Sequence, residues 1–147
     1  MQRVLALDVG KKRIGLAVSD DLGITAQGLK TLERTRIRDD LDALREVARE
    51  WNIGSLLVGK PLHMSGQESR QSEYTKEFAE RLQQHLRIPL IYWDERLTSA
   101  EAERMLRQAG ASLEQKKKSV DRLAAVLLLE SYLEHQTLTS AREEPLA

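Results

Sequence analysis

The chain has 147 residues, no cysteine and a formal net charge of zero at pH 7. This length suits a single domain, and the lack of cysteine excludes disulfides, thiolate zinc sites and a cysteine nucleophile. The balanced charge excludes a protein that is held to nucleic acid by bulk electrostatics. The sequence shows no apolar stretch of membrane-spanning length and no signal peptide, so we expect a cytoplasmic protein that does not bind membranes.

The chain is predicted to open with a three-strand meander. Residues 3–9 and 13–19 are rich in Val, Leu and Ile. The turn between them, Gly10-Lys11-Lys12, is short enough to require an antiparallel hairpin. A second turn at residues 20–23 leads to a weaker third strand between Ile24 and Leu32.

Helices and strands alternate in the middle of the chain. Apolar stripes at helical spacing predict helices near residues 37–51 and 74–86. Short apolar runs predict strands at 55–58 and 90–93. Because these strands alternate with helices, they should run parallel to the first strand. The prediction is an α/β protein with a five-stranded mixed sheet, an antiparallel three-strand meander plus two parallel strands, flanked by helices.

The last third of the chain is predicted to be helical. Thr98-Ser99-Ala100-Glu101 is a capping box that begins a helix, and Gly110 ends it. A polar, lysine-rich loop then leads to a long helix from Ser119 to about His135. Residues 137–147 lack apolar periodicity and predict a disordered tail, so residues 1–136 are expected to form the single domain.

Three carboxylates lie where folding alone would not place them. Asp8 ends the first strand, Glu95 with Asp94 ends the fifth, and Asp121 shares its helix face with apolar residues. Each acid alone could be a turn or helix-end residue. Charged groups are, however, rarely buried unless they are paired or bound to metal, and the carboxyl ends of parallel strands meet at one edge of a sheet. The three together predict a site for Mg²⁺ or Mn²⁺, which prefer oxygen ligands.

Basic residues gather in three clumps, at Lys11-Lys12-Arg13, Arg34 to Arg38 and Lys116-Lys117-Lys118. The first and third clumps lie within a few residues of Asp8 and Asp121, so we expect them to form a positive rim that suits a polyanion. The middle clump is interpreted as a solvated loop.

Two phosphate-binding motifs are present only in part. Gly54 to Lys60 has the glycine spacing of a phosphate loop, but its interior is an apolar strand and Pro61 follows where a magnesium-binding Ser or Thr belongs. Asp8-Val9-Gly10 also resembles the first phosphate segment of the actin-like ATPases. Those proteins enclose a nucleotide between two such domains, and 147 residues cannot supply both.

Four segments together resemble the YqgF family, also called RuvX. They are Leu7-Asp8-Val9-Gly10 with Arg13-Ile14-Gly15-Leu16-Ala17, Val58-Gly59-Lys60-Pro61-Leu62 with Met64-Ser65-Gly66, Asp94-Glu95-Arg96-Leu97-Thr98, and Val120-Asp121-Arg122-Leu123-Ala124-Ala125. The likeness extends to about Leu133. It implies an RNase H-like fold related to the RuvC junction resolvases, and metal-dependent phosphodiester cleavage with Asp8, Glu95 and Asp121 as the acidic triad. Family members tend to have Leu, Asn and Asp where this chain has Lys60, His63 and Ser65, which bears on substrate preference.

This resemblance leads to an expected mechanism. Two divalent ions about 4 Å apart, held by the triad, would generate hydroxide from bound water and stabilise the leaving oxygen. Because a strand alternates faces, only one of Asp94 and Glu95 can face the ions, and we choose Glu95. Phosphate contacts are expected from Lys11, Lys12, Arg13, Gly66, Gln67, Ser69 and Arg96.

The predicted function is that of a metal-dependent nuclease. The family's usual role implies structured RNA as the substrate, in processing the 5′ end of pre-16S rRNA during ribosome biogenesis. One alternative is a Holliday junction resolvase that acts on branched DNA, and another is a non-catalytic nucleic-acid-binding assembly factor. The sequence leaves open endonuclease or exonuclease action, and a monomer or a homodimer.

Overall fold

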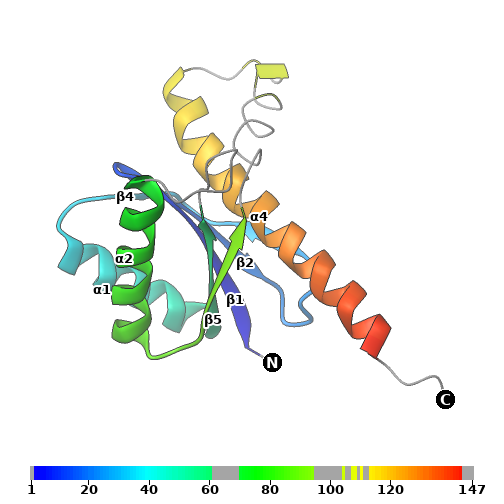
Figure 1. Ribbon diagram of the computed structural model, residues 1–147. Coiled ribbons are helices and arrows are strands. Elements are labelled where there is room, and N and C mark those ends of the chain that lie inside the picture. Colours follow the sequence, from blue (N-terminus) through cyan, green and yellow to red (C-terminus); the bar gives the residue numbers. More distant parts are fainter. Residues whose placement is uncertain are drawn as a thin grey trace.

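The computed structural model describes residues 2–60, 70–94 and 113–143, together with positions 104, 107, 108 and 110. These residues form one mixed sheet with helices on both faces (Figure 1). The helices are α1 (Ile37–Glu50), α2 (Arg70–Leu86) and α4 (Leu113–Glu143). No helix in the described ranges is long and apolar enough to cross a membrane.

The sheet has the mixed topology that the sequence predicts. Its strands are β1 (Arg3–Val9), β2 (Arg13–Ser19), β3 (Ala26–Gly28), β4 (Leu32–Glu33), β5 (Ile53–Lys60) and β6 (Leu90–Asp94). β1 pairs antiparallel with β2 and parallel with β5, and β5 pairs parallel with β6. The carboxyl ends of β1, β5 and β6 therefore lie at the same edge of the sheet.

The expected third strand is divided into β3 and β4, which both pair with β2. Gly28 lies opposite Ala17, and Leu32 lies opposite Ile14. Residues 29–31 therefore lie opposite residues 15 and 16, so the edge strand carries one extra residue. Such a bulge interrupts pairing and bends the strand.

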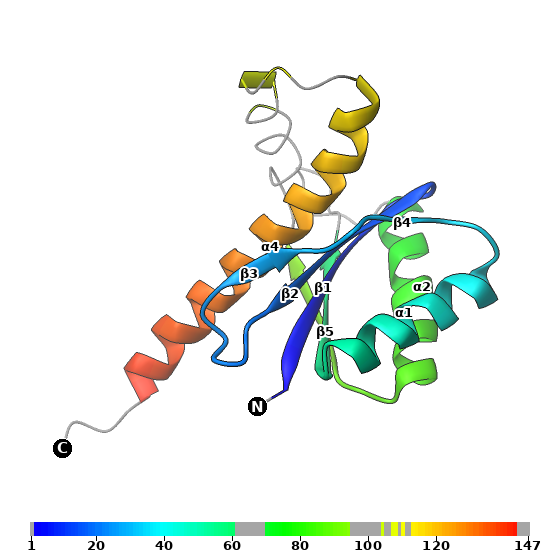
Figure 2. The same ribbon diagram turned by 180° about the vertical axis from the view of Figure 1, so that it is seen from behind.

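The alternation of side chains along β1 creates two cores. Leu5 and Leu7 are fully buried against α1 and α2, whereas Ala6 is buried beneath α4. Figures 1 and 2 show α1 and α2 together on one side of the sheet and α4 crossing the other. Because side chains alternate, Asp8 lies on the same face as Ala6, toward α4.

Helix α4 is longer than the sequence predicts. It begins at Leu113, so Lys116–Lys118 are helical, and the expected loop there is wrong. Lys, Gln and Glu are good helix formers, so the polar composition of this stretch did not require a loop. The helix continues through residues 137–143, where the sequence predicts a disordered tail. The capping box at Thr98–Glu101 lies outside the described residues, but Gly110 has the left-handed φ of 74° that is typical after a helix end.

The interpretation of the Arg34 to Arg38 clump as solvated is wrong for Arg34. Arg36 and Arg38 are exposed, but the side chain of Arg34 is only 9% exposed. Its Nε donates to Oδ2 of the buried Asp40 at 3.3 Å. The buried carboxylate at the start of α1 thus pairs with one arginine of the clump. The run of basic residues in the sequence does not reveal this ion pair.

Candidate metal centre

Asp8 and Asp121 are brought together by a glycine between them. Asp8 lies opposite Gly15 in the register of β1 and β2. A Cβ added to Gly15 would lie 1.9 Å from the backbone oxygen of Asp121, so α4 rests directly on β2 at this point. Only glycine permits so close an approach of two backbones. The packing of α4 on β2 therefore brings the helix acid to the strand acid.

The electrostatics of Asp121 show that the two carboxylates interact. Burial, and to a smaller extent the negative charge of Asp8, raise the pKa of Asp121 to about 6. Arg13 acts in the opposite direction, because its Nε donates to Oδ2 of Asp121 at 3.2 Å. The Asp121 side chain is 24% exposed, which leaves it reachable from solvent. Two partly buried acids that repel one another are an arrangement that a cation would stabilise.

Asp121→Asn should make the metal-free protein more stable at neutral pH. The folded pKa of Asp121, about 6, lies above its ordinary value of 3.8, so the native state binds this proton more tightly than the unfolded chain. The free energy of unfolding should therefore fall as pH rises from about 4 to 6, and the loss should persist above pH 6. Asp121→Asn avoids this loss, so its free energy of unfolding at neutral pH should exceed that of the wild type by about 2 kcal/mol, after allowance for the partial exposure of the side chain. Urea unfolding in chelator at pH 4 and 7.5 tests this, and a variant destabilised equally at both would contradict it.

The third expected acid, Glu95, lies outside the described residues, as do Gly66, Gln67, Ser69 and Arg96. Asp94 is the last residue of β6, and its register partner is Lys60, the last residue of β5. Within the described ranges, no group of three or more metal-type side chains gathers. The structure thus brings two of the three predicted acids together and describes the strand that leads to the third.

The basic turn beside Asp8 is exposed as the sequence predicts. Lys11 and Lys12 are both exposed, and Gly10 closes the turn by donating its N–H to the Arg13 carbonyl at 2.9 Å. The side chain of Arg13 contacts Asp121 at 3.2 Å, and its expected phosphate contact stays a prediction. Lys11 and Lys12 are the exposed cations of this turn that can bind a phosphate.

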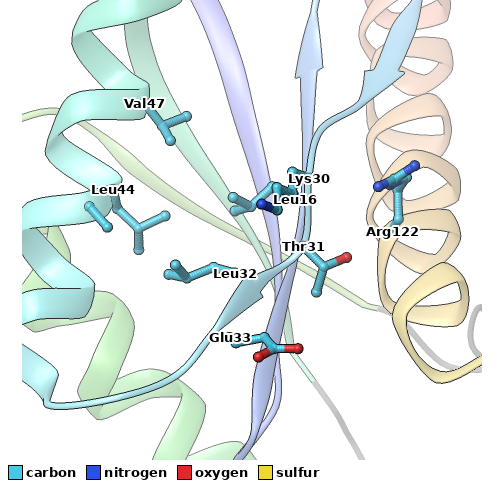
Figure 3. A pocket seen from close by; sticks show the side chains of 9 residues that line it. Leu16, Lys30, Thr31, Leu32, Glu33, Leu44, Val47 and Arg122 are labelled. Carbon is cyan, nitrogen blue, oxygen red and sulfur yellow. The ribbon is translucent and has the colours of Figure 1, made fainter. Parts of the chain in front are cut away.

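A cleft of about 610 Å³ at the edge of the sheet was not predicted. Its lining residues are Leu16, Lys30, Thr31, Leu32, Glu33, Ala43, Leu44, Val47 and Arg122. Figure 3 shows Leu44 and Val47 on one side, Arg122 on the other, and Lys30 between them. The cleft adjoins the β3–β4 bulge, and a bulge depends on strand pairing that sequence patterns do not specify. Lys30 and Arg122 are exposed cations of this cleft, and Glu33 is an acid in the same lining.

Comparison with solved structures identifies the class of fold. The chain is similar to T. thermophilus RuvC in complex with Holliday junction substrate, with a TM-score of 0.60, 15% identity, and coverage of 95% of this chain and 98% of that one. It is also similar to the fowlpox virus resolvase in complex with Holliday junction DNA, with a TM-score of 0.57, 14% identity, and coverage of 92% and 99%. The protein therefore has the RNase H-like fold of the RuvC-type resolvases.

Comparison of sequences identifies the family within this class. The family model "RuvX: Holliday junction resolvase" matches residues 2–135. A protein of Koribacter versatilis, named "Putative pre-16S rRNA nuclease", is 50% identical over 145 residues, which cover 99% of this chain and 94% of that protein. A protein of the same name from Syntrophomonas wolfei is 43% identical over 136 residues, covering 92% and 96%. The chain belongs to the RuvX family.

Proposed function

We propose that this protein is a metal-dependent nuclease that hydrolyses phosphodiester bonds in the 5′ region of pre-16S rRNA. The observation that carries the proposal is the pairing of Asp8 with Asp121, in which burial and mutual repulsion raise the pKa of Asp121 to about 6. The repulsion within such a pair destabilises the folded state, and a bound cation would relieve it. The names of the relatives from Koribacter versatilis and Syntrophomonas wolfei support ribosomal RNA as the substrate. A cytoplasmic location stays a prediction.

The residues present fit a hard divalent cation. The acids Asp8, Asp121 and Glu95 would hold Mg²⁺ or Mn²⁺, because they offer only carboxylate oxygens. The bound metal supplies a water of lowered pKa and stabilises charge on the phosphate. Glu95 follows directly after the last residue of β6, and its part as the third ligand is what the family resemblance implies.

The remaining roles concern the substrate and the approach of its phosphates. Lys11 and Lys12 would hold backbone phosphates beside Asp8, and Lys30 and Arg122 would hold them along the edge strands β3 and β4. In the metal-free protein Arg13 keeps Oδ2 of Asp121 paired. Further phosphate contacts would come from Gly66, Gln67, Ser69 and Arg96. Partners other than nucleic acid are not required, and either a monomer or a homodimer could cut RNA.

A second candidate function is Holliday junction resolution. The description of the matching family model and the titles of the similar structures favour it. A four-way junction requires two coordinated cuts, so this function needs a dimer. A third candidate, a non-catalytic assembly factor, would keep the nucleic-acid surface and lack efficient cleavage.

The decisive experiment incubates the protein with labelled pre-16S RNA and with a four-way DNA junction, in Mn²⁺ or in chelator. We expect cleavage of the RNA in Mn²⁺ alone. Glu95→Gln should abolish this cleavage, whereas the matched control Asp94→Asn, one residue earlier, should retain most of it. Cleavage of the junction alone would identify a resolvase. RNA binding without cleavage in any metal would identify an assembly factor.

A further inference from the structure

Arg34 is a nearly buried arginine whose guanidinium joins three separate elements. Its Nε donates to Asp40 of α1, and its Nη1 donates to the Gly10 carbonyl at 3.1 Å. Nη1 also donates to the hydroxyl of Tyr74 on α2. The guanidinium lies over the rings of Tyr74 and Phe78, with its carbon 4.6 Å from the centroid of Phe78. Arg34 therefore connects the β1–β2 turn to both helices on one face of the sheet.

The turn that Arg34 holds is the one that carries the exposed lysines. The side chain binds the carbonyl of Gly10, and the backbone N–H of Arg34 donates to the carbonyl of Lys12 at 2.9 Å. Residue 34 thus contacts both ends of the Gly10–Lys12 segment. This segment begins two residues after Asp8, so its orientation determines where the ammonium groups of Lys11 and Lys12 lie relative to the candidate metal centre.

The carboxylate that anchors Arg34 is itself fixed. Asp40 is 2% exposed, and its Oδ1 accepts hydrogen bonds from the backbone N–H of Thr35 at 3.0 Å and from the Thr35 hydroxyl at 3.4 Å. Its other oxygen, Oδ2, accepts from Arg34. The guanidinium is therefore held in one orientation by α1, with its Nη1 directed at the Gly10 carbonyl and the Tyr74 hydroxyl.

A purely structural role does not explain why this residue is an arginine. A buried ion pair is weak evidence for stability, since well-packed apolar residues often replace one without loss. The planar guanidinium, in contrast, can donate to a carboxylate, a carbonyl and a hydroxyl at once, which an ammonium on a flexible stem cannot do in the same geometry. The set of partners suits a residue that fixes the orientation of the turn.

We propose that Arg34 is a positioning residue, which preorganises the Gly10–Lys12 turn so that Lys11 and Lys12 bind substrate phosphates. This inference rests on the proposed function, because it concerns how the same site binds nucleic acid. A turn that is already ordered in the free protein loses less conformational entropy on binding, and the affinity rises accordingly. Arg34 itself remains shielded from the phosphates.

The test is Arg34→Lys, which keeps the charge and can still pair with Asp40 but loses the simultaneous contacts to the turn. We expect the Kd for a pre-16S RNA fragment in Ca²⁺ to rise about tenfold, with kcat in Mn²⁺ changed less than about twofold. The slope of log Kd against log salt should stay as in the wild type, since both lysines still reach phosphates in the complex. The Lys11→Ala/Lys12→Ala variant should lose affinity and about one unit of slope per lost contact.

The matched control is Arg3→Lys. Arg3 also donates to a backbone carbonyl, pairs with an aspartate and lies over an aromatic ring, but it sits at the opposite end of β1 from Asp8. The Arg3→Lys substitution should lower the free energy of unfolding without changing the Kd for RNA. Equal effects of Arg3→Lys and Arg34→Lys on the Kd would overturn the proposal. So would a reduced salt slope in Arg34→Lys, because it would mean that fewer phosphate contacts form in the complex than in the wild type.

Amide hydrogen exchange separates this inference from the proposed function. In Arg34→Lys without nucleic acid, the N–H groups of residues 10–13 should exchange faster than in the wild type, while those of β5 should not change. If the wild type neither binds nor cuts RNA, the proposed function fails, yet this readout still tests whether Arg34 orders the turn. Tyr74→Phe removes one partner alone and should show the same changes to a smaller extent; unchanged exchange in both variants would overturn the proposal.

Discussion

Asp8→Asn should abolish metal-dependent cleavage and leave the metal-free protein at least as stable as the wild type. The loss of rate should exceed about 1000-fold, because a ligand that orients a catalytic metal contributes several kcal/mol and each 1.4 kcal/mol is a factor of ten. The gain in stability follows from Asp121, whose pKa is raised by burial and, to a smaller extent, by the negative charge of Asp8. Removing that charge relieves the repulsion between the two carboxylates. Single-turnover cleavage and thermal unfolding in chelator measure the two effects.

The matched control for Asp8→Asn is Asp42→Asn. Asp42 is an aspartate of α1 with a 54% exposed side chain, and its partner is His85 near the end of α2. Its neutralisation should change neither cleavage nor metal binding. If Asp8→Asn melted well below the wild type in chelator, Asp8 would be a structural residue and the proposed metal centre would be wrong.

The core of the sheet was predictable because its strands are short apolar runs that turns or helices separate. The expected strands at 3–9 and 13–19 match β1 and β2, and the two later apolar runs lie within β5 and β6. The division of the third strand into β3 and β4 was not predictable. It depends on how residues 29–31 pair with β2, and no local pattern in that segment specifies the register.

The inward position of Asp121 was also predictable from its helix. Ala124, Ala125 and Leu128 share its face and are almost completely buried. The partners of the charged residues were not predictable in the same way. Arg13 and Asp121 are 108 positions apart, and only the packing of α4 on β2 brings them within 3.2 Å. A clump of basic residues in the sequence shows where cations are abundant. Which of them is buried, as Arg34 is, depends on contacts with residues that are distant in sequence.

Among substitutions that add one methyl group to the described sheet beneath α4, Gly15→Ala should lower the free energy of unfolding most. The new Cβ would lie 1.9 Å from the backbone oxygen and 2.4 Å from the carbonyl carbon of Asp121. Both atoms belong to the helix backbone, so no rotamer change can relieve the clash, and α4 must move away from β2. We expect a loss of about 3 kcal/mol or more in the free energy of unfolding, at the upper end of overpacking effects.

The control for Gly15→Ala is Gly28→Ala, a substitution on the neighbouring strand β3 under the same helix. There the Cβ would meet Cγ of Arg122 at 2.7 Å and Cγ2 of Val126 at 3.2 Å. These are side-chain atoms, and the stem of the exposed Arg122 can turn aside, so the cost should stay near 1 kcal/mol. Movement of α4 should also carry Asp121 away from Asp8, so folded Gly15→Ala protein should show a smaller Mn²⁺-dependent rise in Tm than Gly28→Ala. Equal Mn²⁺ shifts in the two variants would mean that the contact of α4 with Gly15 does not set the distance between the two acids.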